Sequence, residues 1–294
     1  MSAAIEVMTM FNSELVDIVC IGSGSAGLAA AIAAADAGLS VFVAEPRRRG
    51  SQTGSAATDP VESWPALLQK HWGADEFDES TAAYLDQLTC DLGPPRRSPA
   101  HGQLPVGSVE SFAEDGAVNP RAAVPPFYGN ELAHWARECL TSPYGLMFSR
   151  VSPLAMSEMR LENGTTIRAS VVAEIPSARR SGMTLRQWLR DMAKERGVKI
   201  HGSSTIQRLL FHDGQPVGVM VDTPDGIRHV RACRGVLLGT SNSNVDDLLA
   251  THPESVLRGG RLSLVSRNAS RFARMELLTS AADLDVCAPQ SRLA

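Results

Sequence analysis

The hydrophobic pattern near the start of the chain predicts a strand, a helix and a second strand in direct succession. Residues 15–21 form a short apolar run that suits a buried parallel strand, and an alanine-rich helix follows over residues 28–37, ended by Gly38. Residues 41–44 make a second apolar strand. This order is typical of a β–α–β unit and favours the α/β class.

A second periodic block lies late in the chain, over residues 184–240. It opens with an amphipathic helix and a short strand at 198–201, and a strand–turn–strand series follows around Asp213-Gly214 and Asp225-Gly226. The block closes on another apolar strand at 235–238. These patterns predict an antiparallel β-meander after the helix.

The region between the two blocks has a less regular pattern. Prolines and glycines mark a loop-rich stretch over 94–105, and residues 125–140 predict a turn followed by an amphipathic helix. Residues 157–175 predict a hairpin around Asn163-Gly164. The middle region is therefore expected to be irregular α+β structure.

Composition and net charge limit the kinds of partner that this chain is expected to bind. With 294 residues, 44% hydrophobic and 20% charged, the chain can bury the core of one large domain or two intimate ones. The net charge of -4 gives no overall attraction to nucleic acid or to an anionic membrane. The five cysteines are scattered and expected to be reduced, and no export signal or membrane span is recognised, so a cytoplasmic location is predicted.

The turn after the first strand carries the sequence GSGSAG at residues 22–27. Gly22 allows a tight turn, Gly24 lets the backbone approach a pyrophosphate, and Gly27 lets the helix and strand pack closely. The helix N-terminus offers N–H groups and a positive dipole end to phosphates. Glu45 ends the second strand, about 20 positions after the first glycine, where a carboxylate accepts hydrogen bonds from a ribose. The chain is predicted to bind an adenine dinucleotide.

Both periodic blocks, with GSQTGSAA at residues 50–57, resemble the FAD-dependent oxidoreductases of the fumarate reductase and succinate dehydrogenase flavoprotein superfamily, which includes the 3-ketosteroid dehydrogenases. The resemblance implies a Rossmann-like FAD-binding fold, with a mostly parallel sheet, helices, an antiparallel β-meander and an inserted irregular α+β region. Residues 1–60 and 184–245 would form the FAD-binding domain, 61–183 the insertion, and 246–294 a C-terminal extension available for partner contact.

The resemblance also implies which residues contact FAD. The family has a Ser-(His or Asn)-Thr stretch that runs toward the flavin, and the membrane-bound members bind the flavin covalently through the histidine. Gln52 stands at that position, so FAD is expected to be held non-covalently. The residues expected to contact FAD are Gly22, Gly24, Ser25, Ala26, Gly27, Glu45, Pro46, Gly50, Ser51, Gln52, Thr53, Ile206, Thr240 and Ser241.

The sequence departs from the family near the expected flavin ring. Thr58-Asp59 replaces a Gly-Gly pair, and Ser241-Asn242 stands where the family has the glycines of an Ala-Thr-Gly-Gly-Phe pattern. No segment after Asn244 resembles the family's cap domain or its flavin-closing segment. A second protein subunit is therefore expected to complete the flavin and substrate site, which makes the chain part of a hetero-oligomer.

Tyr128 and His134 are the candidate catalytic residues, because either could donate a proton while hydride moves at a flavin. The alternative makes Phe127, Tyr128 and Trp135 core or interface aromatics and His134 a hydrogen-bonded helix residue. The histidines of the late strands lack metal-ligand spacing, so no metal site is expected.

Two functions from different classes remain open. The first is an FAD-binding subunit of a flavin-dependent dehydrogenase or reductase, which desaturates a C–C bond or reduces an enoyl group in a small hydrophobic substrate such as a steroid. The second is a degenerate, non-catalytic FAD-fold scaffold or regulatory partner, favoured by the replaced glycines. A thiazole-synthase-like protein is a more distant third.

Overall fold

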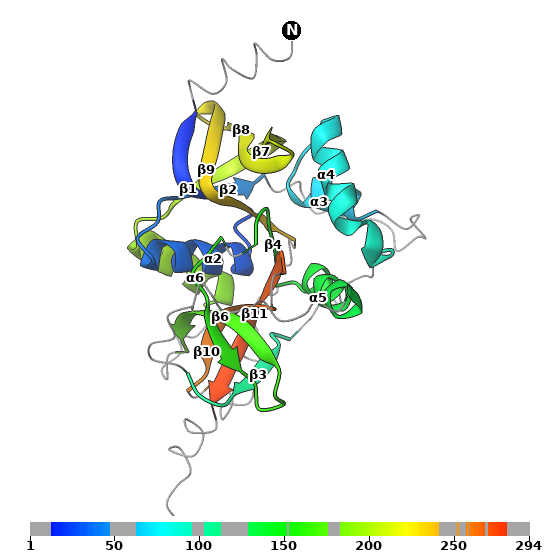
Figure 1. The fold of residues 1–294 in the computed structure, drawn as a ribbon. Helices are drawn as coiled ribbons and strands as arrows, with labels where there is room; N and C mark the ends of the chain where they lie inside the picture. Colours follow the sequence, from blue (N-terminus) through cyan, green and yellow to red (C-terminus); the bar gives the residue numbers. More distant parts are fainter. Residues whose placement is uncertain are drawn as a thin grey trace, which may run out of the picture.

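The described strands of the computed structural model form one 11-stranded mixed sheet with helices on both faces (Figure 1). The residues that the structure describes are 13–47, 63–95, 103–112, 129–151, 153–175, 183–240, 252, 257, 259–267 and 270–280.

The predicted strand–helix–strand unit is confirmed as β1 (Glu14–Ile21), α2 (Ser25–Asp36) and β2 (Val41–Pro46). β1 pairs in parallel with β2 on one side and with β9 (Gly226–Gly239) on the other. The helix begins at Ser25, three residues before the predicted start, because the last residues of the glycine motif form its first turn. The glycine motif therefore lies at the carboxyl end of a central parallel strand.

The late block folds as α6 (Leu185–Glu195), β7 (Lys199–His212), β8 (Gln215–Thr223) and β9, which confirms the predicted helix and meander. A capping box formed by Thr184 and Gln187 starts the helix. The short strand predicted at 198–201 does not stop there: β7 bends at Ser203, which has a φ of 53°, and continues into the meander. β7 thereby pairs in parallel with β2 and antiparallel with β8.

The remaining strands extend the sheet beyond β9 in the order β4, β11, β10, β6 and β5, all with antiparallel neighbours. Their bounds are Gly145–Phe148 for β4, Ser157–Arg160 for β5, Thr166–Glu174 for β6, Arg261–Ser266 for β10 and Phe272–Ser280 for β11. β3 (Val106–Val109) pairs in parallel with β11.

The hairpin predicted around Asn163-Gly164 is the connection between β5 and β6, and it is confirmed. The side chain of Asn163 accepts a hydrogen bond from the N–H of Thr165, and Gly164 has a φ of 83°. Strands from the predicted C-terminal extension pair with strands from the predicted insertion, so the described parts of these segments share one sheet. The predicted domain boundaries themselves stay a prediction.

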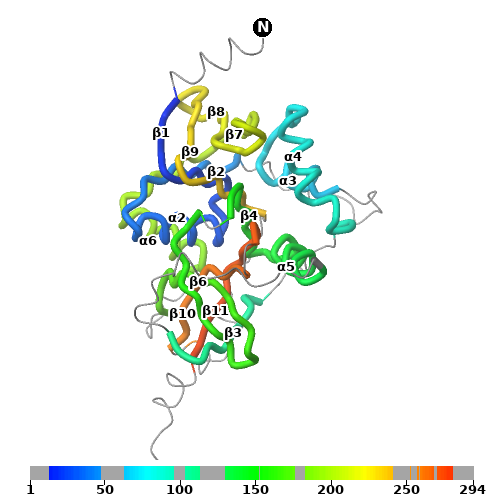
Figure 2. The backbone as a smooth tube through the Cα atoms, in the orientation of Figure 1, coloured from blue at the N-terminus to red at the C-terminus, as the bar shows by residue number. Residues whose placement is uncertain are grey.

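Helices cover the two faces of the parallel strands, as Figure 2 traces. α2 and α6 pack on the face that carries Ile18 and Cys20, while α3 (Trp64–His71) and α4 (Glu79–Thr89) cover the face that carries Val19 and Ile21. A one-turn 3₁₀ helix, η1 (Cys90–Leu92), follows α4. The alternation of burial along β1 follows from the two-residue period of a strand.

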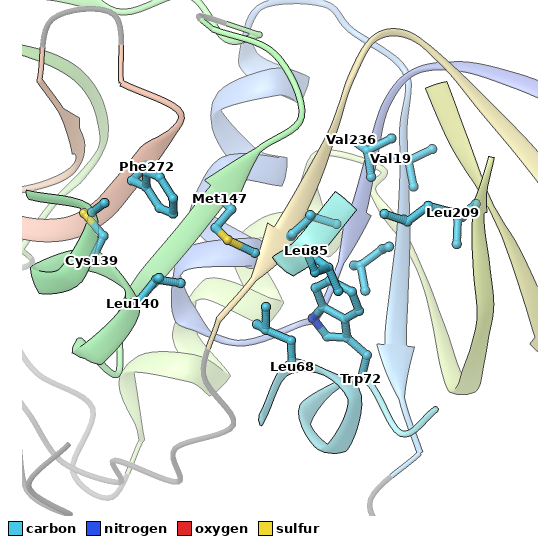
Figure 3. Packing of buried hydrophobic residues seen from close by; sticks show 14 of the residues in the cluster. Val19, Leu68, Trp72, Leu85, Cys139, Leu140, Met147, Leu209, Val236 and Phe272 are labelled. Atoms are coloured by element: carbon cyan, nitrogen blue, oxygen red, sulfur yellow. The ribbon is translucent and has the colours of Figure 1, made fainter. Parts of the chain in front are cut away.

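The second face also packs α5 (Gly129–Thr141), the helix predicted within 125–140. Figure 3 shows Leu68 and Trp72 of the α3 region next to Leu85 of α4, with Met147 and Phe272 toward the α5 end of the same cluster. Trp135 of α5 is 1% exposed, and its indole N–H donates to the carbonyl of Phe272 at 3.0 Å. The interpretation of Trp135 as a core aromatic is confirmed.

Candidate dinucleotide site

The glycine loop adopts the geometry that a phosphate-binding turn needs. Gly22 has a φ of 103°, which favours glycine, and a side chain at Gly27 would clash with the carbonyl oxygen of Gly22. Gly24 is the N-cap of α2 and provides no side-chain cap. The N–H groups of the first helical turn therefore have no side-chain acceptor at their N-cap and can serve an anionic ligand.

The thiol of Cys20 contacts two backbone carbonyls of the glycine loop. It lies 3.6 Å from the carbonyl oxygen of Gly22 and 3.5 Å from that of Gly27. Complete burial raises the pKa of the Cys20 thiol to about 12, so the side chain remains a protonated weak donor at neutral pH. Cys20, Cys90, Cys139 and Cys233 are all free thiols.

Glu45 ends β2 beside the loop, and its carboxylate is surrounded by donors. Arg190 donates to both oxygens at 2.8 and 2.7 Å, and Arg186 donates to Oε1 at 2.6 Å. The hydroxyl of Ser23 adds a bond to the same oxygen at 2.8 Å. The hydrogen bonds from Arg190 are the largest cause that lowers the pKa of Glu45 to about 2, so the carboxylate is ionised.

Arg186 also ties α6 to the glycine loop directly. Its Nε donates to the carbonyl of Ser23 and its Nη2 to the hydroxyl of Ser23, both at 2.9 Å. Arg186 and Arg190 stand four positions apart, so they share one face of α6. Neither arginine was predicted from the sequence as part of the site. The pattern that could have indicated them is two basic residues four positions apart in the predicted helix. An exposed helix face has the same pattern equally often, so the spacing alone does not indicate a site.

Two further polar groups lie buried beside the loop. His71 of α3 is 8% exposed and has no hydrogen-bond partner for either ring nitrogen among the described residues. Thr240, directly after β9, has a buried hydroxyl that also lacks a partner in the described part of the chain. The sequence predicted Thr240 but missed His71, for which the local pattern provides no signal.

The structure brings most of the described candidate residues to one edge of the sheet. The strand ends and the loop gather at the carboxyl ends of β1, β2 and β9, which is where open α/β sheets generally bind their ligands. The residues gathered there are Gly22, Gly24, Ser25, Ala26, Gly27, Glu45, Pro46 and Thr240. Ile206 of β7 is buried two residues after Ser204, whose carbonyl accepts the N–H of Arg47 at 2.8 Å. Their roles as FAD ligands stay predictions.

The other candidates fall elsewhere. The side chain of His134 on α5 is 66% exposed, and its Nδ1 lies 3.8 Å from a carboxylate oxygen of Glu138. His134 thus lies on a helix, as the alternative expects, but 3.8 Å is too long for a hydrogen bond, so its hydrogen-bonded role and its catalytic role both stay predictions. The candidates outside the described residues are Gly50, Ser51, Gln52, Thr53, Tyr128 and Ser241, together with Phe127 and the departures at Thr58-Asp59 and Asn242.

The residues present fit the diphosphate of a dinucleotide well. A glycine cradle, an uncapped helix N-terminus and the buried imidazole of His71, which has no partner in the described chain, meet at the same place. The ribose position fits as well: both oxygens of Glu45 already accept hydrogen bonds, and a ribose hydroxyl either adds to Oε2, to which Arg190 donates, or displaces a guanidinium.

The fold and this site define a dinucleotide-binding α/β protein. Residues 17–278 match the family described as FAD dependent oxidoreductase, and the chain belongs to that family. The family, the Rossmann-like fold and FAD as the family's cofactor are thereby confirmed.

A similar curated protein is the 3-oxosteroid 1-dehydrogenase of Mycolicibacterium smegmatis. It is 27% identical over 273 residues, which cover 79% of this chain and 48% of the relative. The chain thus spans about half the length of the curated relative that it matches.

Two of the solved structures that the chain matches are an oxidoreductase of steroids and a fumarate reductase. One is the 3-ketosteroid-Δ4-(5α)-dehydrogenase of Rhodococcus jostii RHA1, with 20% identity, 76% of this chain and 45% of that chain covered, and a TM-score of 0.29. Another is the open conformation of a flavocytochrome c3 fumarate reductase, with 17% identity, 79% and 34% covered, and a TM-score of 0.31.

Among the helices that the structure describes, none has the length and apolar character needed to cross a membrane.

Proposed function

We propose that this chain is the FAD-binding part of a flavin-dependent dehydrogenase or reductase. The observation that carries the proposal is the meeting of the glycine loop, the ionised Glu45 and the buried, unpartnered groups of the described site at one sheet edge. The loop and the N-terminus of α2 hold the diphosphate, and Glu45 orients the adenosine ribose. When bound, FAD supplies a group that takes or gives a hydride.

The reaction we propose is C–C desaturation, or its reverse, on a small hydrophobic ketone such as a steroid. The support is the 27% identity with a 3-oxosteroid 1-dehydrogenase over 273 residues. Desaturation removes a hydride from one carbon and a proton from its neighbour, so a base must accept the proton. Tyr128 and His134 are the candidates for that role, and the exposure of His134 favours Tyr128 for a site closed to water.

We further propose that a second subunit completes the substrate site. The support is the sequence at the expected flavin end, where Thr58-Asp59 and Ser241-Asn242 replace the glycines of the family. Backbone that must approach a ring closely usually needs glycine. A second chain could supply the contacts that this end of the site does not make.

The test is to purify the chain alone and after co-expression with the product of its neighbouring gene. Each sample is measured for flavin by absorption after acid release, and for oxidation of a 3-oxosteroid with an artificial electron acceptor. Flavin in both samples with turnover only in the pair supports the full proposal. Turnover by the chain alone contradicts the two-subunit part, and absence of flavin from both contradicts the FAD-binding function.

A non-catalytic scaffold is the second candidate, and one observation favours it. The carboxylate of Glu45 carries four hydrogen bonds from within the chain, as a structural anchor of α6 would. A stoichiometric flavin that dithionite reduces and air reoxidises excludes a nucleotide-free scaffold.

A further inference from the structure

The imidazole of His71 lies beside the glycine loop. The end of α3 is fixed there because the indole N–H of Trp72 donates to the carbonyl of Gly239 at 2.8 Å. A methyl group placed on Gly22 or on Gly239 would lie 3.6 Å from Nε2 of His71. The imidazole therefore faces both the first glycine of the loop and the last residue of β9.

The environment of His71 leaves both ring nitrogens without hydrogen bonds from the described chain. Burial, and secondarily the charge of Arg186, lower the pKa of His71 to about 4, so the ring is neutral at pH 7. A neutral imidazole has one N–H donor and one acceptor, and buried polar groups in native proteins are nearly always paired. The hydroxyl of Thr240, one residue after Gly239, is a second such group. The two ring nitrogens of the 8% exposed His71 side chain, unpaired within the described chain and close to the glycine loop, indicate a polar ligand.

We propose that His71 donates a hydrogen bond to the diphosphate of bound FAD. The proposal rests on the FAD-binding function proposed above. The diphosphate of a dinucleotide lies over the glycine loop at the N-terminus of the following helix. Nε2 of His71 lies 3.6 Å from a methyl group placed on Gly22, the first glycine of that loop. A hydrogen bond to an anionic oxygen is among the stronger kinds, and burial removes the competition from water.

Two helices from different parts of the chain would then hold the loop. Arg186 of α6 grips it through the carbonyl and hydroxyl of Ser23, and His71 of α3 closes it from the other face of the sheet. In this arrangement α3 excludes water from the diphosphate, and His71 donates a hydrogen bond to one of its negatively charged oxygens.

The experiment titrates FAD, ADP and adenosine into the wild-type chain and into His71→Leu and His71→Gln by calorimetry. His71→Leu should weaken FAD and ADP at least ~10-fold, the worth of one charge-assisted hydrogen bond, and should leave adenosine unchanged. His71→Gln, whose amide N–H can reach the same oxygen, should stay within about threefold of wild type. His212→Leu is the matched control, because His212 is 58% exposed at the end of β7.

Thermal unfolding of the ligand-free variants shows whether each is folded. His71→Leu should unfold at or above the wild-type temperature, because it replaces an unpaired buried polar group with an apolar one. Unchanged or tighter binding of FAD by a folded His71→Leu overturns the proposal, as does an equal loss of adenosine affinity. A wild-type chain that binds neither FAD nor ADP refutes the proposed function itself, whereas failure confined to the variant comparison refutes only the role of His71.

Discussion

Replacing Arg190 by methionine should tighten FAD binding while it destabilises the ligand-free chain. Arg190 donates to both oxygens of Glu45: Nη1 to Oε1 at 2.8 Å and Nη2 to Oε2 at 2.7 Å. The substitution leaves Glu45 with its bonds from Arg186 and Ser23, so no buried charge is left unpaired. It frees one carboxylate oxygen for a ribose hydroxyl.

The magnitude follows from the geometry of this ion pair. Hydrogen bonds between charged groups contribute about 1.5–3 kcal/mol when buried, and partial exposure reduces this. The side chains are 31% and 17% exposed, so we take about 1–2 kcal/mol for the pair. The ligand-free chain should lose that free energy of unfolding. If the ribose must displace the guanidinium, FAD affinity should rise by about 5–30-fold, because about 1.4 kcal/mol is tenfold.

The assay is calorimetric titration of FAD together with urea denaturation of the ligand-free protein. Arg196→Met is a matched control: Arg196 pairs with Asp36 at 2.6 Å, also joins the α6 end to α2, and lies apart from Glu45. The control should lower stability without changing FAD affinity. Unchanged or weaker FAD binding by Arg190→Met refutes the competition between ribose and guanidinium.

Three further changes have defined outcomes. Between pH 6.5 and 4 the unfolded chain binds a proton at His71 that the folded chain, with a pKa of about 4, does not. Stability should therefore fall by up to about 3 kcal/mol as the pH is lowered through this window, and urea denaturation of His71→Leu should lack this loss. Gly27→Ala, whose methyl group would clash with the carbonyl of Gly22, should destabilise the chain by about 1–3 kcal/mol or more in urea denaturation and abolish FAD binding in titration. Trp72→Phe removes the bond to Gly239 and should cost about 1 kcal/mol in the same denaturation assay; an unchanged midpoint would contradict that bond.

The parts of the fold that the sequence predicted are those encoded by local chemistry. The strand–helix–strand unit could be predicted because its glycines perform tasks that other residues do not. The meander could be predicted because Asp213 and Gly214 both adopt positive φ, as the turn between β7 and β8 requires. The continuation of β7 could not be predicted. The strand bends at Ser203, which has a positive φ, and serine has no intrinsic preference for that conformation.

The parts of the site that the sequence did not predict depend on contacts between distant segments. Arg190 reaches Glu45 across 145 positions, and Trp72 reaches Gly239 across 167. Nothing in the local pattern around His71 indicates that α3 ends over the glycine loop. The sequence therefore predicted the cradle of the dinucleotide, and the structure added the side chains that enclose it.

The most direct test of the account is a titration of FAD into the purified wild-type chain, repeated with ADP present in excess. We predict one FAD bound per chain and displacement by ADP, because the glycine loop and Glu45 recognise the half of FAD that ADP shares. No binding of FAD, or binding that ADP does not displace, would contradict it.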